Sequence, residues 1–103
     1  NVTPSINQTS NRLKAKAEEE MLKQLKETAE KEIPRLESLI EMKTAQSDEL
    51  RRLIQNQSAD PRDQVAARTA CRRIDGEINE LQRHLRNHYA VLGKTYTYSL
   101  RQL

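Results

Sequence analysis

An all-α fold is what this sequence predicts, in the form of an antiparallel helical hairpin packed like a coiled coil. The 103 residues include no Trp or Phe and two Gly, and 32% of them are charged. β-Sandwiches and α/β domains need more aromatic residues and more turn glycines. Two long segments carry apolar residues at helical spacing, with a short polar segment between them. We therefore expect one helical domain over 10–92, part of a longer protein, between a flexible segment 1–9 and a tail 93–103.

The clearest helix is expected over 61–92. Asp60 can cap its free N–H groups, Pro61 suits the first helical position, and Gly93 suits the left-handed conformation that ends a helix. Its seam positions alternate in steps of four and three residues: Ala67, Cys71, Ile74, Ile78, Leu81, Leu85, His88 and Leu92. This spacing lasts for more than three heptads, so it predicts a helix that packs against another helix.

A longer helix is expected over 10–57, beginning at Ser10 or, as an alternative, at Thr3 before a first-turn proline. Pro34 lies inside it, where a proline removes one hydrogen bond and costs about 3 kcal/mol. Either one helix is kinked at 33–34, or two helices break there and the chain becomes a three-helix bundle. We favour the kink, because no loop residues surround the proline. The apolar stripe of this segment is broad and irregular: Leu22, Leu25, Ala29, Ile33, Leu36, Leu39, Ile40, Leu50, Leu53 and Ile54.

Residues 57–60 are expected to reverse the chain, because a helix–helix connection of two to eight residues sets two helices side by side. Folding there predicts Leu36 near Ile78–Leu81 and Leu25 near Leu92. The longer helix then overhangs its mate, and part of its stripe stays open to a third helix, a second copy or a partner. The residues that we expect to make this contact are Leu22, Leu39, Met42 and Ile54.

The tail carries Tyr96 and Tyr98 in alternation with polar residues, a period of two that favours an extended segment. Such a segment suits the edge of a partner's sheet, so both tyrosines are candidate partner-binding residues. It also suits folding back over the overhang near Leu22 and Leu25. A third interpretation continues the helix through the tail, with its apolar residues on one side.

A second candidate contact is a basic face on helix 61–92. The net charge is +3, and 59–103 hold eight Lys and Arg against five acids. Arginine side chains suit phosphate and carboxylate groups, although a solvated face balanced by neighbouring acids fits the pattern as well. Gly76 leaves a gap on this face, which either admits a partner backbone or has no role. The arginines away from the apolar seam are Arg72, Arg73, Arg83 and Arg86.

No enzyme chemistry is expected. His84, His88 and Glu80 follow one another at one-turn spacing, as zinc ligands can, but no second Cys or further His completes the shell, so we expect no metal. Cys71 falls on the apolar seam, where a thiol packs as a small apolar residue. The sequence has no glycine-rich phosphate loop and no nucleophile beside a base. We therefore expect no catalytic residue, no cofactor and no small-molecule substrate.

These features favour a non-enzymatic helical protein–protein interaction module. The expected partner is a helix or a small globular protein, such as a small GTPase or a trafficking or scaffold component, or a second copy in a homo-oligomer. The alternative is a basic helical module that binds nucleic acid or an anionic membrane through the arginine face. A single cysteine and the lack of an apolar stretch of about 20 residues favour an intracellular, cytoplasmic location.

Overall fold

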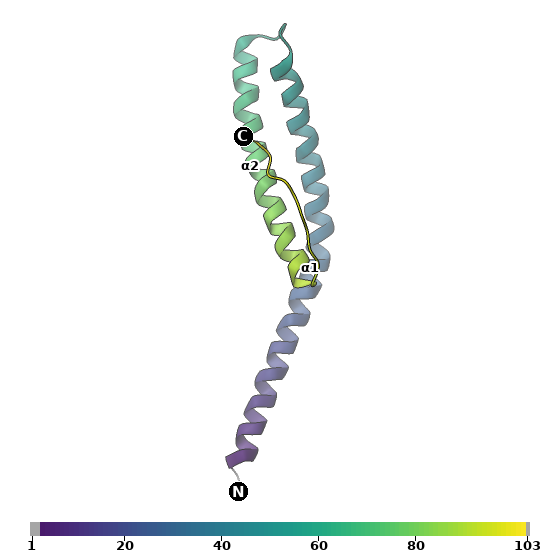
Figure 1. Ribbon diagram of the computed structural model, residues 1–103, viewed down its shortest axis with the longest axis vertical. Helices are drawn as coiled ribbons and strands as arrows, with labels where there is room; N and C mark the ends of the chain where they lie inside the picture. Colours follow the sequence, from purple (N-terminus) through teal and green to yellow (C-terminus); the bar gives the residue numbers. More distant parts are fainter. Residues whose placement is uncertain (1–2, 103) are drawn as a thin grey trace.

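The chain folds as an elongated hairpin of two helices, which confirms the predicted all-α helical hairpin (Figure 1). The computed structural model describes the backbone of residues 3–102 and the side chains of residues 8–102. Helix α1 spans Thr3–Gln55 and helix α2 spans Pro61–Val91. The molecule measures 86 × 19 × 17 Å. Its length comes from α1, because 53 helical residues extend over about 80 Å at 1.5 Å per residue.

Helix α1 is continuous through Pro34, so the three-helix alternative is wrong. In Figure 1 the helix changes direction close to the level where α2 ends, in the part of α1 that contains this proline. A proline bends a helix because its ring displaces the preceding turn. The other end also differs from the expected start at Ser10, because α1 already begins at Thr3, the alternative start. Residues 3–9, expected as a flexible segment, are therefore helical, and Asn1 and Val2 lie outside the described residues.

The turn and the start of α2 follow the predicted capping chemistry. The side chain of Asp60 accepts a hydrogen bond of 2.8 Å from the backbone N–H of Arg62, and Pro61 occupies the first turn. On the other side of the turn, the side chain of Asn56 accepts a hydrogen bond of 3.0 Å from the backbone N–H of Ser58. The side-chain amide of Gln64 donates to the backbone oxygen of Asn56 at 2.7 Å and so ties the two helix ends together.

The core is a narrow seam between the helices, and its register differs from the predicted one. Glu37 accepts a 2.7 Å hydrogen bond from the hydroxyl of Tyr89. The short side chain of Ser47 contacts both Cys71 and Asp75. With this offset Leu36 lies level with the part of α2 just beyond Leu81, and Leu25 lies beyond the end of α2. The prediction counted residues outward from the turn, whereas the register follows side-chain contacts between the helices, such as that of Lys43 with Glu77. The buried apolar residues are Ala29, Leu36, Ala67, Cys71, Ile74, Ile78 and Leu85.

The tail leaves α2 through a glycine turn. Gly93 has φ 71°, its N–H donates to Ala90 at 2.9 Å, and the N–H of Lys94 donates to Tyr89 at 2.9 Å. This pair of bonds is the Schellman motif, which reverses the chain at a helix end. The tail then runs extended alongside the two helices toward the turn (Figure 1). It does not continue as a helix, and it runs away from the overhang near Leu22 rather than covering it.

Candidate interaction surfaces

The best-formed polar site of the hairpin is centred on the carboxylate of Asp75, which is completely buried. Its oxygens accept hydrogen bonds from Ser47 Oγ at 2.6 Å and from Arg101 Nε at 2.7 Å, and Arg51 forms a further ion pair with it. Three segments therefore meet at one buried carboxylate, because Ser47 and Arg51 belong to α1 and Arg101 belongs to the tail. A buried carboxylate is tolerated only with such partners.

The electrostatics of this site keep Asp75 ionised. Burial is the largest single influence and opposes the charged form, but the hydrogen bonds from Ser47 and Arg101, together with the positive charges of Arg101 and Arg51, outweigh it. The pKa of Asp75 is therefore lowered from its ordinary value. The pKa of Arg101 is raised, chiefly by the hydrogen bond to Asp75. Each partner stabilises the charge of the other.

The backbone of the tail is held beside the same site. The side-chain amide of Asn79 makes two hydrogen bonds to the backbone of Arg101. It accepts one from the N–H of Arg101 at 2.8 Å and donates the other to the carbonyl oxygen of Arg101 at 3.1 Å. Arg101 also reaches Asp48 at 3.1 Å, and Arg51 donates to the carbonyl of Gln102 at 3.1 Å. We call this arrangement the clasp, defined by the following residues: Ser47, Asp48, Arg51, Asp75, Asn79 and Arg101. It fixes the tail to both helices.

The tyrosines of the tail pack on the hairpin. Tyr96 stacks on Tyr89 with ring centroids 5.2 Å apart, and Tyr98 follows at 5.6 Å from Tyr96. Arg86 lies over the ring of Tyr98 at 5.8 Å, a cation–π geometry. The structure thus brings together three of the predicted partner-binding residues, Tyr96, Tyr98 and Arg86, in a contact within the chain.

The remaining arginines of the predicted basic face do not gather into one patch. Arg73 pairs with Glu77 at 3.1 Å and Arg83 with Glu80 at 2.5 Å, both within α2. Arg72 is exposed and lines a shallow depression beside the clasp. A Cβ added at Gly76 would meet nothing within 4 Å, so among the described residues no side chain and no other segment closes over this gap.

The four predicted apolar contact residues lie at different levels of α1 and form no common patch. Leu22 is 47% exposed on the overhang, and Met42 is 51% exposed beside the hairpin. Leu39 and Ile54 are half-buried, and Ile54 lines the depression next to Arg72. The distance along the helix from Leu22 to Ile54 is about 48 Å.

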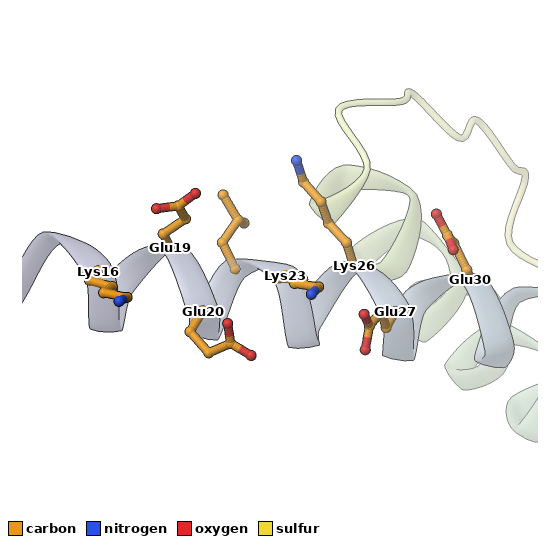
Figure 2. A pocket seen from close by; sticks show the side chains of 8 residues that line it. Lys16, Glu19, Glu20, Lys23, Lys26, Glu27 and Glu30 are labelled. Carbon is orange, nitrogen blue, oxygen red and sulfur yellow. The ribbon is translucent and has the colours of Figure 1, made fainter.

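The longest continuously exposed segment of the described residues is the part of α1 beyond the end of α2, residues 8–28, which we call the arm. Every described side chain of the arm is exposed, including Leu13 at 66% and Met21 at 64%. One face is highly charged, and Figure 2 shows it: Glu19, Lys26 and Glu30 point to one side of the helix and Glu20 and Glu27 to the other. Leu22 lines this face as well, whereas Leu25 does not.

The residues that we considered for catalysis or metal binding lie in ordinary structural settings. Cys71 is buried, and its thiol lies 3.5 Å from Ser47 Oγ and 3.6 Å from a carboxylate oxygen of Asp75. His84 lies 3.9 Å from Glu80 across one exposed turn of α2. Within residues 3–102, no group of three His, Cys, Asp or Glu side chains is placed to hold a metal ion. In the same part of the chain, neither helix has a stretch both long and apolar enough to cross a membrane.

Comparisons with protein-family models, curated proteins and solved structures find no match to this chain. What the chain does is therefore inferred from its own side chains. Of these, the exposed arm and the clasp are the two most distinctive groups.

Sequence reasoning missed most of the clasp. Asp75 was interpreted as a balance to neighbouring arginines, although it lies one helical turn from both Cys71 and Asn79 and immediately after the seam residue Ile74. Ser47 lies in the gap that the apolar stripe of the first helix leaves between Ile40 and Leu50. One sequence pattern could have indicated the clasp: a small hydroxyl residue in the stripe of one helix together with an acid beside the seam of the other.

Proposed function

We propose that the chain is a non-enzymatic helical interaction module, in which the clasped hairpin is a rigid holder and the arm binds a protein partner through a helix. The observation that carries this proposal is the exposure of the whole arm, residues 8–28. Leu22 and Leu25 continue the stripe of α1 by one heptad beyond the last buried residue, Ala29, and are 47% and 48% exposed. An amphipathic helix without a partner is a common recognition element.

The hairpin supports this role because it fixes the base of the arm. Helix α1 runs without interruption from the arm into the core, so the arm is anchored by Leu36 and by the ion pair of Lys43 with Glu77 at 2.5 Å. Isolated helices of about 15 residues are marginal in water, whereas a helix already nucleated in a folded domain extends at lower cost. The arm is therefore presented in a helical form before binding.

A photo-cross-linking side chain introduced at Leu25 in the full-length protein tests this function. We expect an adduct with a protein, identified by mass spectrometry as a single segment with helical apolar spacing. Lys23 is the matched control, because it lies on the charged face of the same turn. Equal labelling from Leu25 and Lys23, or no protein adduct from either, would contradict the proposal.

The alternative function, nucleic-acid or anionic-membrane binding through the arginine face, has less support. Arg73 and Arg83 pair with acids of α2 and Arg86 packs on Tyr98, which leaves a sparse positive surface. Phosphate contacts would make the affinity fall steeply with salt. Binding to generic RNA, to DNA or to phosphatidylserine vesicles at physiological ionic strength, with loss in Arg72→Glu, would favour this alternative over the arm.

We place the module in the cytoplasm as part of the same proposal. The support is the single cysteine, Cys71, which is buried and free, because secreted domains of this size usually depend on disulfides. Fractionation of cells that carry the full-length protein checks the location, and recovery in a secreted fraction would contradict it.

A further inference from the structure

We propose that the arm also pairs with the arm of a second copy of this chain, packed antiparallel about Ala17. This inference rests on the proposed function, because it needs the arm to be presented as a helix, but it uses a face of the arm other than the one that carries Leu22 and Leu25. The contact surface is a stripe of uncharged residues on the arm, which differs from the continuation of the hairpin seam at Leu22 and Leu25: Ser10, Leu13, Ala17, Met21 and Gln24. All five are exposed, and their spacing of three and four residues sets them along one side of the helix.

The stripe is symmetric about its central residue. Leu13 and Met21 lie four residues before and after Ala17, and Ser10 and Gln24 lie seven residues before and after it. When two such helices pack antiparallel with Ala17 beside Ala17 of the second copy, each Leu13 faces a Met21 and each Ser10 faces a Gln24. A twofold axis thus makes the surface complementary to itself, as in most dimers.

The charges beside the stripe have the same symmetry. Lys14 and Glu18 flank it on one side, one residue after Leu13 and Ala17, whereas Lys16 and Glu20 flank it on the other. In an antiparallel pair related by a twofold axis, the same flanks of the two helices meet. Lys14 of one copy then lies about 3 Å along the axis from Glu18 of the other, and Lys16 lies equally close to Glu20. The dimer therefore gains four opposite-charge contacts.

A parallel pair would have the reverse electrostatics. The basic residues within 12–16 would lie beside the same basic residues of the second copy, and the acidic run 18–20 would lie beside its own equivalent. Within the described chain, none of Lys14, Lys16, Glu18 and Glu20 forms an ion pair. Pairs in which Lys precedes Glu by four residues are also the less favourable order within one helix. These charges are thus available to a second copy.

The shape of the molecule leaves room for this pairing. The arm extends about 30 Å beyond the hairpin, and the hairpin of the second copy begins near its Ala29, which lies beyond Ser10 at the end of the stripe of the first copy. The two hairpins therefore lie at opposite ends of a rod, with the paired arms between them. No segment of either hairpin competes for the stripe.

A charge exchange tests the pairing in sedimentation equilibrium of the full chain. We expect the parent chain to dimerise at low salt and to weaken as salt increases. Lys14→Glu with Lys16→Glu should weaken self-association by roughly tenfold or more, because four exposed attractions become repulsions. Glu18→Lys with Glu20→Lys should do the same. A mixture of the two variants should restore the dimer as a heterodimer. Circular dichroism checks that both variants remain helical.

Cysteine cross-linking tests the direction. Under mild oxidation Ala17→Cys should form a disulfide between two copies, because this residue faces itself across the axis. Gln24→Cys should not, because its equivalent lies about 21 Å away along the rod. Efficient cross-linking at both positions would indicate a parallel pair and overturn the inference, as would a monomeric parent chain at low salt or a mixture that fails to associate.

The outcome also separates this inference from the proposed function. A monomeric chain whose Leu25 cross-links to a different protein would overturn the self-pairing and leave the interaction function intact. A monomeric chain without any adduct at Leu25 would overturn both.

Discussion

The clasped hairpin and the arm are parts of one helical protein, but they are stabilised in opposite ways. The hairpin has a thin apolar seam and adds a buried ionic site, where Asp75 joins α1, α2 and the tail. The arm has neither a seam partner nor a clasp, although it carries Leu13 and Met21 on its surface. The difference teaches that helical spacing alone does not decide which apolar residues are buried. The length of the opposing helix decides it.

The largest effect on folding is expected at Asp75. Asp75→Asn keeps the shape of the side chain but leaves Arg51 and Arg101 without their buried counter-charge, which should lower the free energy of unfolding by about 3 kcal/mol. We take the lower end of the range that is typical of breaking a buried ion pair, because the side chain of Arg51 is 41% exposed. Urea unfolding measures the effect. Asp48→Asn is the control, since Asp48 is 50% exposed and should change stability by less than about 1 kcal/mol. Equal effects of the two variants would contradict the assignment of this stability to the buried carboxylate of Asp75.

A smaller loss is expected when the tail is released. Arg101→Ala removes charge-assisted hydrogen bonds to Asp75 and Asp48, and should destabilise the hairpin by about 2 kcal/mol. Arg101→Lys retains the charge without the planar fork and should lie between this variant and the parent. Urea unfolding together with trypsin cleavage after the exposed Lys94 follows the release. Unchanged cleavage in Arg101→Ala would show that the tyrosine stack alone holds the tail.

The pH dependence of stability should come from the hairpin. The folded-state pKa of Asp75 is lowered, so its contribution is fully present above the ordinary aspartate pKa of about 4 and is lost as the pH falls through the lower folded value. Glu77 acts in the same direction, because its hydrogen bond from Lys43 lowers its pKa. Thermal unfolding between about pH 5 and pH 2 should show a steeper loss for the parent than for Asp75→Asn. Parallel curves would contradict the assignment.

The smallest effect is expected on the arm. Leu22→Ala should change the free energy of unfolding by less than about 0.5 kcal/mol, because Leu22 is 47% exposed and lies outside the core of the hairpin. Urea unfolding at low protein concentration measures it without self-association. A loss as large as that of Arg101→Ala would mean that the arm folds against the hairpin rather than apart from it.

The sequence predicted the parts of the fold that depend on local chemistry. Asp60, Pro61 and Gly93 mark the ends of α2 because caps depend on neighbouring residues alone. The register and the path of the tail were not predictable in this way. They depend on which side chains meet across the hairpin, and Asn79 binds the backbone of Arg101 from 22 residues away. The exposed arm was predicted from the unequal helix lengths, whereas the clasp required the three-dimensional arrangement.

The continuity of α1 has a mechanical consequence. A pull on the arm acts along the axis of the same rod that lies against α2. Sliding α1 past α2 would strain three cross-links at once: those from Glu37 to Tyr89, from Lys43 to Glu77 and from Ser47 to Asp75. Contacts that a force along the helix axis loads together resist separation of the helices better than contacts that break one after another. A force on the arm along this axis would therefore be resisted by several contacts between α1 and α2 together.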